Sequence, residues 1–157
     1  MSSDPKSNSV LREFDRSLPM TLLKAREAVM RKFLPSLREH DLSAQQWRVL
    51  RALMEAPHRD ASDIAEHCAI LLPSLSRILQ NLERRSLIRR KTDRKDQRRS
   101  LVSITPKGVR LVEKIAPISE ERYRLIAEKF GEQRLSDLYD MLAQLIECLE
   151  TDEGKLS

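Results

Sequence analysis

Glycine, aromatic residues and paired cysteines are all scarce in this chain of 157 residues. Only three glycines are present, which excludes a turn-rich all-β fold and a glycine-rich phosphate-binding loop. Aromatic residues make up 4% of the chain, so leucine, isoleucine, valine and methionine must supply the core, which favours packed helices. The two cysteines, Cys68 and Cys148, lie far apart and lack the spacing of a metal site. We therefore expect a mainly helical protein in a reducing, cytoplasmic setting, with no metal or other cofactor.

Long apolar runs and catalytic motifs are missing as well. No segment is apolar enough to span a bilayer, and the N-terminus lacks the basic start and apolar stretch of a secretory signal. The histidines are not spaced with carboxylates or cysteines as a metal site, and no nucleophile motif is present. The sequence therefore predicts that the chain is not an enzyme.

Positive charge is plentiful but confined to one stretch. Between Arg84 and Arg99 there are nine basic residues against two acidic ones, so this window carries a net charge of +7 while the rest of the chain sums to −2. Charge concentrated in this way is typical of a surface that binds a polyanion.

Apolar periodicity and capping residues predict the order of elements along the chain. Helices are expected at about 17–38, from Ser43 to Pro57, within 60–70, from Pro73 to about 86, from Thr105 to about 130, and after Gly131 to about 150. Strands are expected at 87–91 and 99–104, joined by a charged turn. Ser43 and Gln46 form a capping-box pattern, and the expected buried stripe of the helix that follows is Trp47, Leu50, Leu53 and Met54.

This order predicts a mainly α protein with a small β-hairpin wing, in which a winged helix-turn-helix is flanked by N- and C-terminal dimerisation helices. We assign residues 1–16 to a disordered lead, 43–105 to a DNA-binding lobe, 17–42 and 106–150 to a dimerisation region, and 151–157 to a disordered tail. The flanking helices are apolar on one side, so a second copy of the chain is the simplest partner for them. A symmetric dimer would present two recognition helices to a two-fold DNA site.

The stretch IAEHCAILLPSLSRILQNLERRSLIRRKTDRKDQRRSLVSITPKG resembles the helix-turn-helix and wing of the MarR family of winged-helix transcription regulators. Asp96, Gln97 and Arg98, followed by Val102, Ile104, Thr105 and Gly108, fall in the register of the family's wing. The stretches SLPMTLLKAREAVMRKFLPSLREHDLSAQQWRVLRAL and CAILLPSLSRIL are most similar to the subgroup that represses homoprotocatechuate (4-hydroxyphenylacetate) catabolism. The resemblance covers roughly residues 17–150 and implies a homodimeric, cytoplasmic DNA-binding repressor that a small aromatic acid releases from a pseudo-palindromic operator.

The chain departs from the family pattern at four positions. Ala69 and Leu71 stand where the family has a glycine and a polar cap before the recognition helix. Ser86 replaces a glycine between that helix and the wing, which costs strain if the residue is left-handed. Arg94 stands where the wing usually carries proline.

Two groups of residues are predicted to contact DNA. The recognition helix offers small polar and bidentate side chains near its start, where base edges in the major groove are accessible. The wing offers arginines and lysines suited to phosphates and to the negative potential of a narrow minor groove. The predicted DNA-binding residues are Pro73, Ser74, Ser76, Arg77, Gln80, Arg94, Lys95, Arg98 and Arg99. Asp96 is expected to hold Arg98 or a neighbour rather than to meet DNA.

A repressor needs a signal, and Arg26 points to one because it lies near the apolar side of the first helix. A guanidinium there has to reach solvent, pair with an internal acid or bind an anionic ligand. The first two outcomes are the more ordinary ones, and the resemblance to regulators that answer small aromatic carboxylates adds weight to the third. The predicted effector-binding residues are Arg16, Ser17, Met20, Leu23, Arg26, Trp47 and Arg51.

Two other functions remain open from the sequence. In a thiol-based redox-sensing regulator Cys68 would be the sensor, although a small buried thiol on the inner side of a helix is ordinary. In a protein-binding winged-helix module, the basic wing would meet an acidic partner instead of DNA.

Overall fold

The computed structural model describes residues 11–92, 94–96 and 99–152 of the chain. The chain falls into two compact units, one up to residue 44 and one from residue 45 onward. The first unit holds a short 3₁₀ helix η1 (Phe14–Arg16) and helix α1 (Leu18–Glu39). The second unit is built from α2 (Ala44–Glu55, which begins at the boundary), β1 (Arg59–Asp60), α3 (Ala61–Cys68), α4 (Leu72–Arg84), β2 (Ile88–Thr92), β3 (Ser100–Ile104), α5 (Pro106–Phe130) and α6 (Glu132–Asp152).

The predicted fold class is confirmed, since helices dominate and two strands form the expected hairpin. The structure adds one strand that the sequence did not reveal. Arg59 and Asp60 pair antiparallel with Val102 and Leu101, giving a three-stranded sheet in the order β1-β3-β2. A two-residue, fully charged strand carries no alternation of apolar and polar residues, so periodicity could not detect it.

The core of the second unit lies where α2, α3 and α4 meet the sheet. Its fully buried side chains include Leu50, Leu53, Ile64, Leu75, Leu82, Ile88 and Val102. The expected buried stripe of α2 was partly wrong: Val49 and Ala52 are buried beside Leu50 and Leu53, whereas Met54 is exposed and Trp47 is only half-buried. The buried face of α2 is therefore rotated by about one position from the predicted one, because the elements packed against a helix, and not its own periodicity, decide which side they cover.

Three helices end in the same way although none ends in glycine. Asp41, Ala69 and Ser86 adopt left-handed backbone angles, with φ of 53°, 51° and 59°. After each of them a buried apolar residue donates its backbone N–H to a carbonyl five positions earlier, namely Leu42 to Leu37, Ile70 to Ala65 and Leu87 to Leu82. This is the Schellman arrangement, in which an apolar contact accompanies the closing hydrogen bond. Ser86 therefore adopts the left-handed conformation whose strain the sequence analysis considered.

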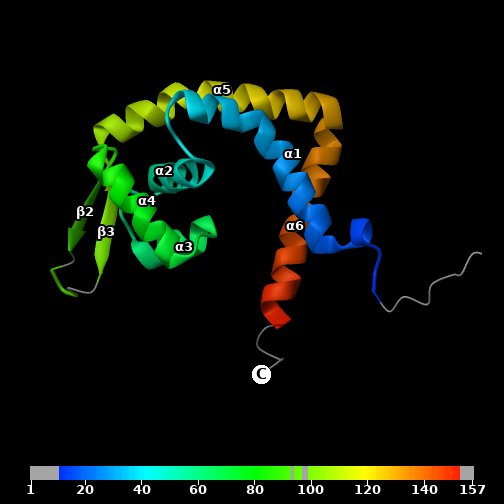
Figure 1. Cartoon of the computed structure of the whole chain (residues 1–157), viewed down its shortest axis with the longest axis horizontal. Coiled ribbons are helices and arrows are strands. Elements are labelled where there is room, and N and C mark those ends of the chain that lie inside the picture. Colours follow the sequence, from blue (N-terminus) through cyan, green and yellow to red (C-terminus); the bar gives the residue numbers. More distant parts are fainter. Residues whose placement is uncertain (1–10, 93, 97–98, 153–157) are drawn as a thin grey trace, which may run out of the picture. The chain divides into compact units, whose positions relative to one another are not determined.

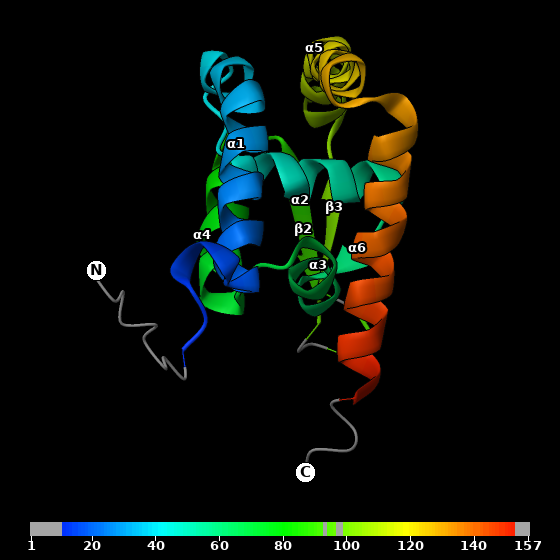
Figure 2. The same cartoon turned by 90° about the vertical axis from the view of Figure 1, so that its right-hand side faces the viewer.

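The two long C-terminal helices are confirmed, with Thr105 capping α5 through a 3.1 Å hydrogen bond from the Gly108 N–H. Helix α5 continues through Pro117 to Phe130, and Gly131 at φ 107° ends it. Figures 1 and 2 show that α5 leads away from the sheet and that α6 runs across the direction of α5. None of the described helices combines the length and apolar character needed to cross a membrane.

Candidate nucleic-acid interface

Helix α4 has a buried side and an exposed side. The buried side carries apolar residues at helical spacing, Leu75, Ile78, Leu79 and Leu82. On the other side, Pro73, Ser76, Arg77 and Gln80 are exposed and Ser74 is half-buried. The small polar and bidentate side chains therefore lie on one accessible face near the start of the helix, the part of a recognition helix that meets base edges.

Side-chain hydrogen bonds fix α4 and α3 against α2. The Gln46 Nε2 donates to Asn81 Oδ1 across 2.9 Å, which joins α2 to the middle of α4. Arg48 Nη1 donates to the Cys68 carbonyl at 2.7 Å, which joins α2 to the end of α3. The sequence analysis placed Gln46 in a capping box and did not predict its contact with Asn81, because nothing in a one-dimensional pattern reveals a contact between residues 35 positions apart. These bonds give the helix-turn-helix a defined orientation.

The hairpin formed by β2 and β3 makes the wing. Ile88 lies opposite Ile104 at its base and Thr92 lies opposite Ser100 near its tip. At the tip, Arg94 and Lys95 are exposed, as the DNA-binding prediction requires. Arg98, which was also predicted to contact DNA, lies outside the described residues, so the expected contact between Asp96 and Arg98 does too.

Arg99 has a partner within the protein. Its Nη2 donates to Asp60 Oδ2 at 2.6 Å, while the other oxygen of the same carboxylate accepts the Asp63 N–H at 2.8 Å. Asp60 thus caps α3 and also holds the returning strand of the wing. The hydrogen bond from the Asp63 N–H and, to a smaller extent, the one from Arg99 lower the pKa of the Asp60 carboxyl. A contact of Arg99 with DNA remains a prediction, and a role in positioning the wing is added to it.

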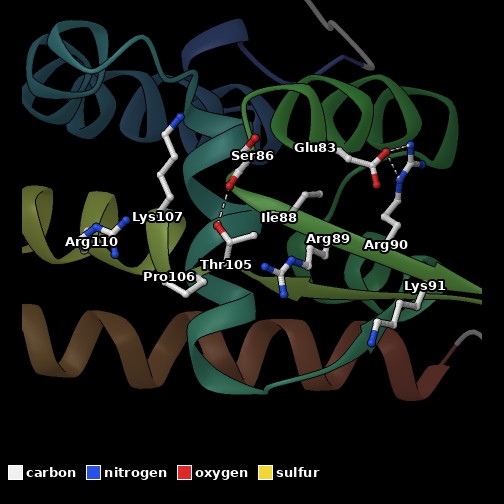
Figure 3. A pocket seen from close by; sticks show the side chains of 10 residues that line it. All are labelled: Glu83, Ser86, Ile88, Arg89, Arg90, Lys91, Thr105, Pro106, Lys107 and Arg110. Carbon is white, nitrogen blue, oxygen red and sulfur yellow. Dashed lines mark hydrogen bonds and ion pairs between the residues drawn. The ribbon is translucent and has the colours of Figure 1, made fainter.

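A hollow lined by cations lies at the base of the wing, between the end of α4, the outer strand β2 and the start of α5 (Figure 3). It measures about 550 Å³ and is lined by Glu83, Ser86, Ile88, Arg89, Arg90, Lys91, Thr105, Pro106, Lys107 and Arg110. Five of these side chains are cationic and one is a carboxylate. The carboxylate, Glu83, accepts two hydrogen bonds from Arg90 at 2.9 and 3.2 Å, and this partner lowers its pKa. The basic window of the sequence therefore extends from the tip of the wing to its base.

Hydrogen bonds to backbone carbonyls brace the base of the wing. Thr105 Oγ1 donates to the Ser86 carbonyl at 2.6 Å, and Lys107 Nζ donates to the Arg85 carbonyl at 3.0 Å. Both carbonyls belong to the end of α4, where helical partners run out. The start of α5 therefore satisfies the end of the candidate recognition helix, a contact that the sequence analysis did not anticipate.

The predicted effector-binding residues fall in both units. Arg16, Ser17, Met20, Leu23 and Arg26 follow one another along η1 and the first half of α1. Ser17 and Met20 are half-buried, whereas Arg16 and Leu23 are exposed. Arg26 is exposed as well, and its Nη1 pairs with Glu27 Oε1 at 3.2 Å. Of the three outcomes foreseen for this guanidinium, the single chain shows the one in which it reaches solvent. In the second unit, Trp47 and Arg51 lie one turn apart on α2.

The environment of Cys68 disfavours redox chemistry. The thiol is buried, its Sγ donates to the Arg48 carbonyl at 3.6 Å, and burial raises its pKa. A sensor thiol needs the opposite conditions, namely exposure and a lowered pKa. Across the described ranges, no cluster of histidine, cysteine and acidic side chains could hold a metal ion.

Comparisons with known proteins agree with this geometry. Residues 40–99 match the sequence model of the MarR family. The chain is 39% identical over 130 residues to the homoprotocatechuate degradative operon repressor of Escherichia coli, covering 83% of this chain and 88% of that protein. It is 40% identical over 129 residues to the transcriptional regulator FarR of Neisseria gonorrhoeae, covering 82% of this chain and 88% of that one.

Solved structures give the same result. The transcriptional regulator PA4135 is 41% identical and superposes with a TM-score of 0.80 over 83% of this chain and 96% of its own. NadR in complex with 4-hydroxyphenylacetate is 38% identical, with a TM-score of 0.74 over 86% and 96% of the two chains. The repressor CouR, bound to a 23-mer DNA duplex, is 27% identical, with a TM-score of 0.78 over 88% and 99%.

Proposed function

This chain belongs to the MarR family of DNA-binding transcriptional regulators, which are not enzymes, and we propose that it represses an operon for the breakdown of an aromatic acid. Two copies would bind a pseudo-palindromic operator, and a small aromatic carboxylate would release them. We expect this to take place in the cytoplasm, where the DNA is.

The observation that carries the DNA-binding role is the polar face at the start of α4 beside a cationic wing. Ser76, Arg77 and Gln80 are exposed on a helix whose other side is fully buried, so they are available to base edges. Arg94 and Lys95 are exposed at the wing tip, and their charge suits phosphates or the minor groove. With Arg98 and Arg99 they would supply the sequence-independent part of the affinity.

Exposed apolar side chains on the flanking helices support a dimer. In the first unit they are Leu18, Leu22, Leu23 and Val29 on α1. In the second unit they are Tyr139, Met141, Ile146 and Leu149 on α6. Apolar side chains left exposed along helices in this way suit a protein interface, and a second copy of the chain offers the same helices in return. The assignment of residues 17–42 and 106–150 to dimerisation rests on this reasoning.

The proposed effector class rests on two lines of support. A relative that is 38% identical over most of its length was solved with 4-hydroxyphenylacetate, and another is named for homoprotocatechuate degradation. In this chain Arg16, Arg26 and Arg51 offer guanidinium groups for a carboxylate, and Trp47 offers an aromatic face. The ligand would act by binding the released arrangement of the two recognition helices more tightly than the DNA-bound one.

One experiment tests DNA binding and release together. The purified protein is mixed with fragments of DNA from upstream of its own gene, and the retained fragment is then titrated with 4-hydroxyphenylacetate, a hydroxycinnamate and salicylate. We expect one of these acids to release the DNA, and the neutral amide of the same compound to be much weaker because it lacks the charge that an arginine pairs with. Arg26→Gln should reduce the response to the acid while leaving the affinity for DNA intact. Retention of the DNA at saturating concentrations of all three acids would reject the aromatic-acid signal and leave DNA binding standing.

A further inference from the structure

Two large apolar side chains lie in solvent at the start of α4. Leu71 is 78% exposed and Leu72 is 52% exposed, although the residue before them, Ile70, and the nearby Leu75 are buried. The core of the second unit is therefore complete without these two leucines. Their exposure needs a reason other than packing within the chain.

Helix capping does not provide that reason. Leu71 occupies the N-cap position of α4 with an extended backbone, φ −66° and ψ 140°, and its side chain makes no capping hydrogen bond. Serine, threonine, aspartate and asparagine stabilise a helix start far better at this position. Leucine there gives up a capping interaction and exposes apolar surface at the same time.

The position of the two leucines identifies a partner. They precede Pro73 and Ser74 and lie at the end of the helix where Ser76 and Arg77 are exposed, so they extend the surface that faces DNA under the proposed function. In the major groove the base edges carry hydrogen-bonding groups and one apolar group, the C5-methyl of thymine. We propose that Leu71 and Leu72 read thymine methyl groups in the operator and so determine part of its sequence.

This inference rests on the proposed DNA-binding function and adds a second kind of readout to it. Arg77 and Gln80 discriminate bases through hydrogen bonds, and removing either affects any sequence that offers those bonds. The leucines instead favour A·T pairs in a fixed orientation, because only the thymine side of the pair presents a methyl group to them. Operators for this chain should therefore hold a thymine in each half-site opposite the start of α4.

Replacing thymine by uracil removes the methyl group and leaves base pairing and phosphate charge unchanged. The retained upstream fragment is prepared once with thymine and once with uracil, and its affinity is measured for the wild-type protein and for the double variant Leu71→Ser/Leu72→Ser. Serine is a good N-cap residue, so the variant should fold at least as well as the wild type. Arg77→Ala serves as the control for removal of a hydrogen-bonding side chain.

For the wild type we expect uracil to lower the affinity about fourfold for each thymine methyl group that a leucine covers, corresponding to about 0.8 kcal/mol. The double variant should bind both DNAs with nearly equal affinity, whereas Arg77→Ala should weaken binding to both and keep the wild-type ratio. Equal binding of the two DNAs by the wild type would overturn the inference while leaving DNA binding in place. A double variant that keeps the full preference for thymine would also overturn the inference. A double variant whose subunits separate in gel filtration would overturn it too, because it would assign the leucines to a protein contact. If the thymine-containing fragment itself is not bound, the proposed function fails, and this inference fails with it.

Discussion

The Arg99 guanidinium lies 2.6 Å from the Asp60 carboxylate, which joins the returning strand of the wing to the residue that caps the first helix of the helix-turn-helix. The two residues are 39 positions apart in the sequence. Because β1 pairs with β3 at the same place, the wing is attached to α3 by backbone and side chain together. The orientation of the wing relative to the helix-turn-helix therefore depends on this carboxylate.

Two substitutions at Asp60 should separate its two roles. Asp60→Asn keeps an oxygen for the Asp63 N–H but removes the charge that holds Arg99, so we expect a loss of less than about 1 kcal/mol for this partly exposed pair. Asp60→Ala removes the cap as well and should cost about 1 kcal/mol more. Urea denaturation measures both. Equal stability of the two variants would show that Asp60 does not cap α3 in solution.

Acidification should destabilise the protein through Asp60 and Glu83. The pKa of each carboxyl is lowered in the folded state, by the Asp63 N–H and Arg99 for Asp60 and by Arg90 for Glu83. A lowered pKa contributes stability that is present above the unfolded-state value of about 4 and is lost as the pH falls through the folded-state value. The free energy of unfolding should therefore decline below about pH 4.

The control for the acid titration is the double variant Asp60→Asn/Glu83→Gln. It cannot titrate at these positions, so its stability should fall less steeply over the same pH range than that of the wild type. Parallel curves for the two proteins would assign the acid sensitivity to other carboxylates.

Neutralising the wing tip should change the salt dependence of operator binding. For Arg94→Ala/Lys95→Ala we expect weaker binding to all sequences and a logarithmic salt slope that is smaller by roughly 0.9 for each phosphate that the wing no longer neutralises. The matched control is Lys107→Ala/Arg110→Ala, which removes the same charge from the hollow at the base of the wing. Lys107 and Arg110 lie near the C-terminal end of α4, whereas the residues proposed to contact bases lie near its N-terminal end. Removing these two cations should therefore leave the slope nearly unchanged. If both pairs changed the slope equally, bulk positive charge rather than the wing tip would explain the affinity.

Removing the backbone strain at the left-handed residue Ser86 should stabilise the protein. At Ser86 the φ of 59° burdens any residue with a Cβ atom, so Ser86→Gly should raise the free energy of unfolding by about 1 kcal/mol. Ser136→Gly, at an exposed position in the second turn of α6, is the control and should lower it by about 0.5 kcal/mol. Thermal and urea denaturation measure the difference. A loss of stability at position 86 would mean that the serine side chain contributes an interaction of its own.

Gly108 should tolerate no side chain. A Cβ atom there would lie 2.3 Å from the Leu87 carbonyl oxygen and 2.6 Å from Ile104 Cγ1. The same carbonyl oxygen accepts a hydrogen bond from the Thr105 N–H, so it is not free to move away. We expect Gly108→Ala to cost about 1–3 kcal/mol, since the start of α5 must move away from the sheet. Lys107→Ala, the neighbouring exposed position, should cost less than about 1 kcal/mol. Unfolding curves of the two variants would contradict this packing if their midpoints coincided.

Much of the fold was accessible from the sequence because its signals are local. Thr105 and Gly131 mark helix ends with residue types that cap or terminate helices, and both act as predicted. The buried side of α4 followed from apolar residues at helical spacing. Strand β1 and the Asp60–Arg99 pair were not predicted, because they depend on segments that meet only in three dimensions.

The candidate site divides in the same way. The exposure of Ser76 and Arg77 follows from the helical periodicity of their neighbours, so it could be foreseen. The hydrogen bonds from Lys107 and Thr105 to the end of α4 depend on where α5 begins relative to the wing, which periodicity does not encode. The stripe of α2 was misjudged at Met54 because a one-position rotation of a helix is set by its neighbours.

The left-handed helix ends at Asp41 and Ser86 mean that this protein holds unused stability in its turns, at positions outside the start of α4 and the tip of the wing. Introducing glycine at these positions would give a variant with a higher free energy of unfolding and an unaltered DNA-facing surface. In that background, weakened operator binding by a substituted wing or recognition helix reports on recognition itself, because the altered protein remains fully folded under the conditions of the assay.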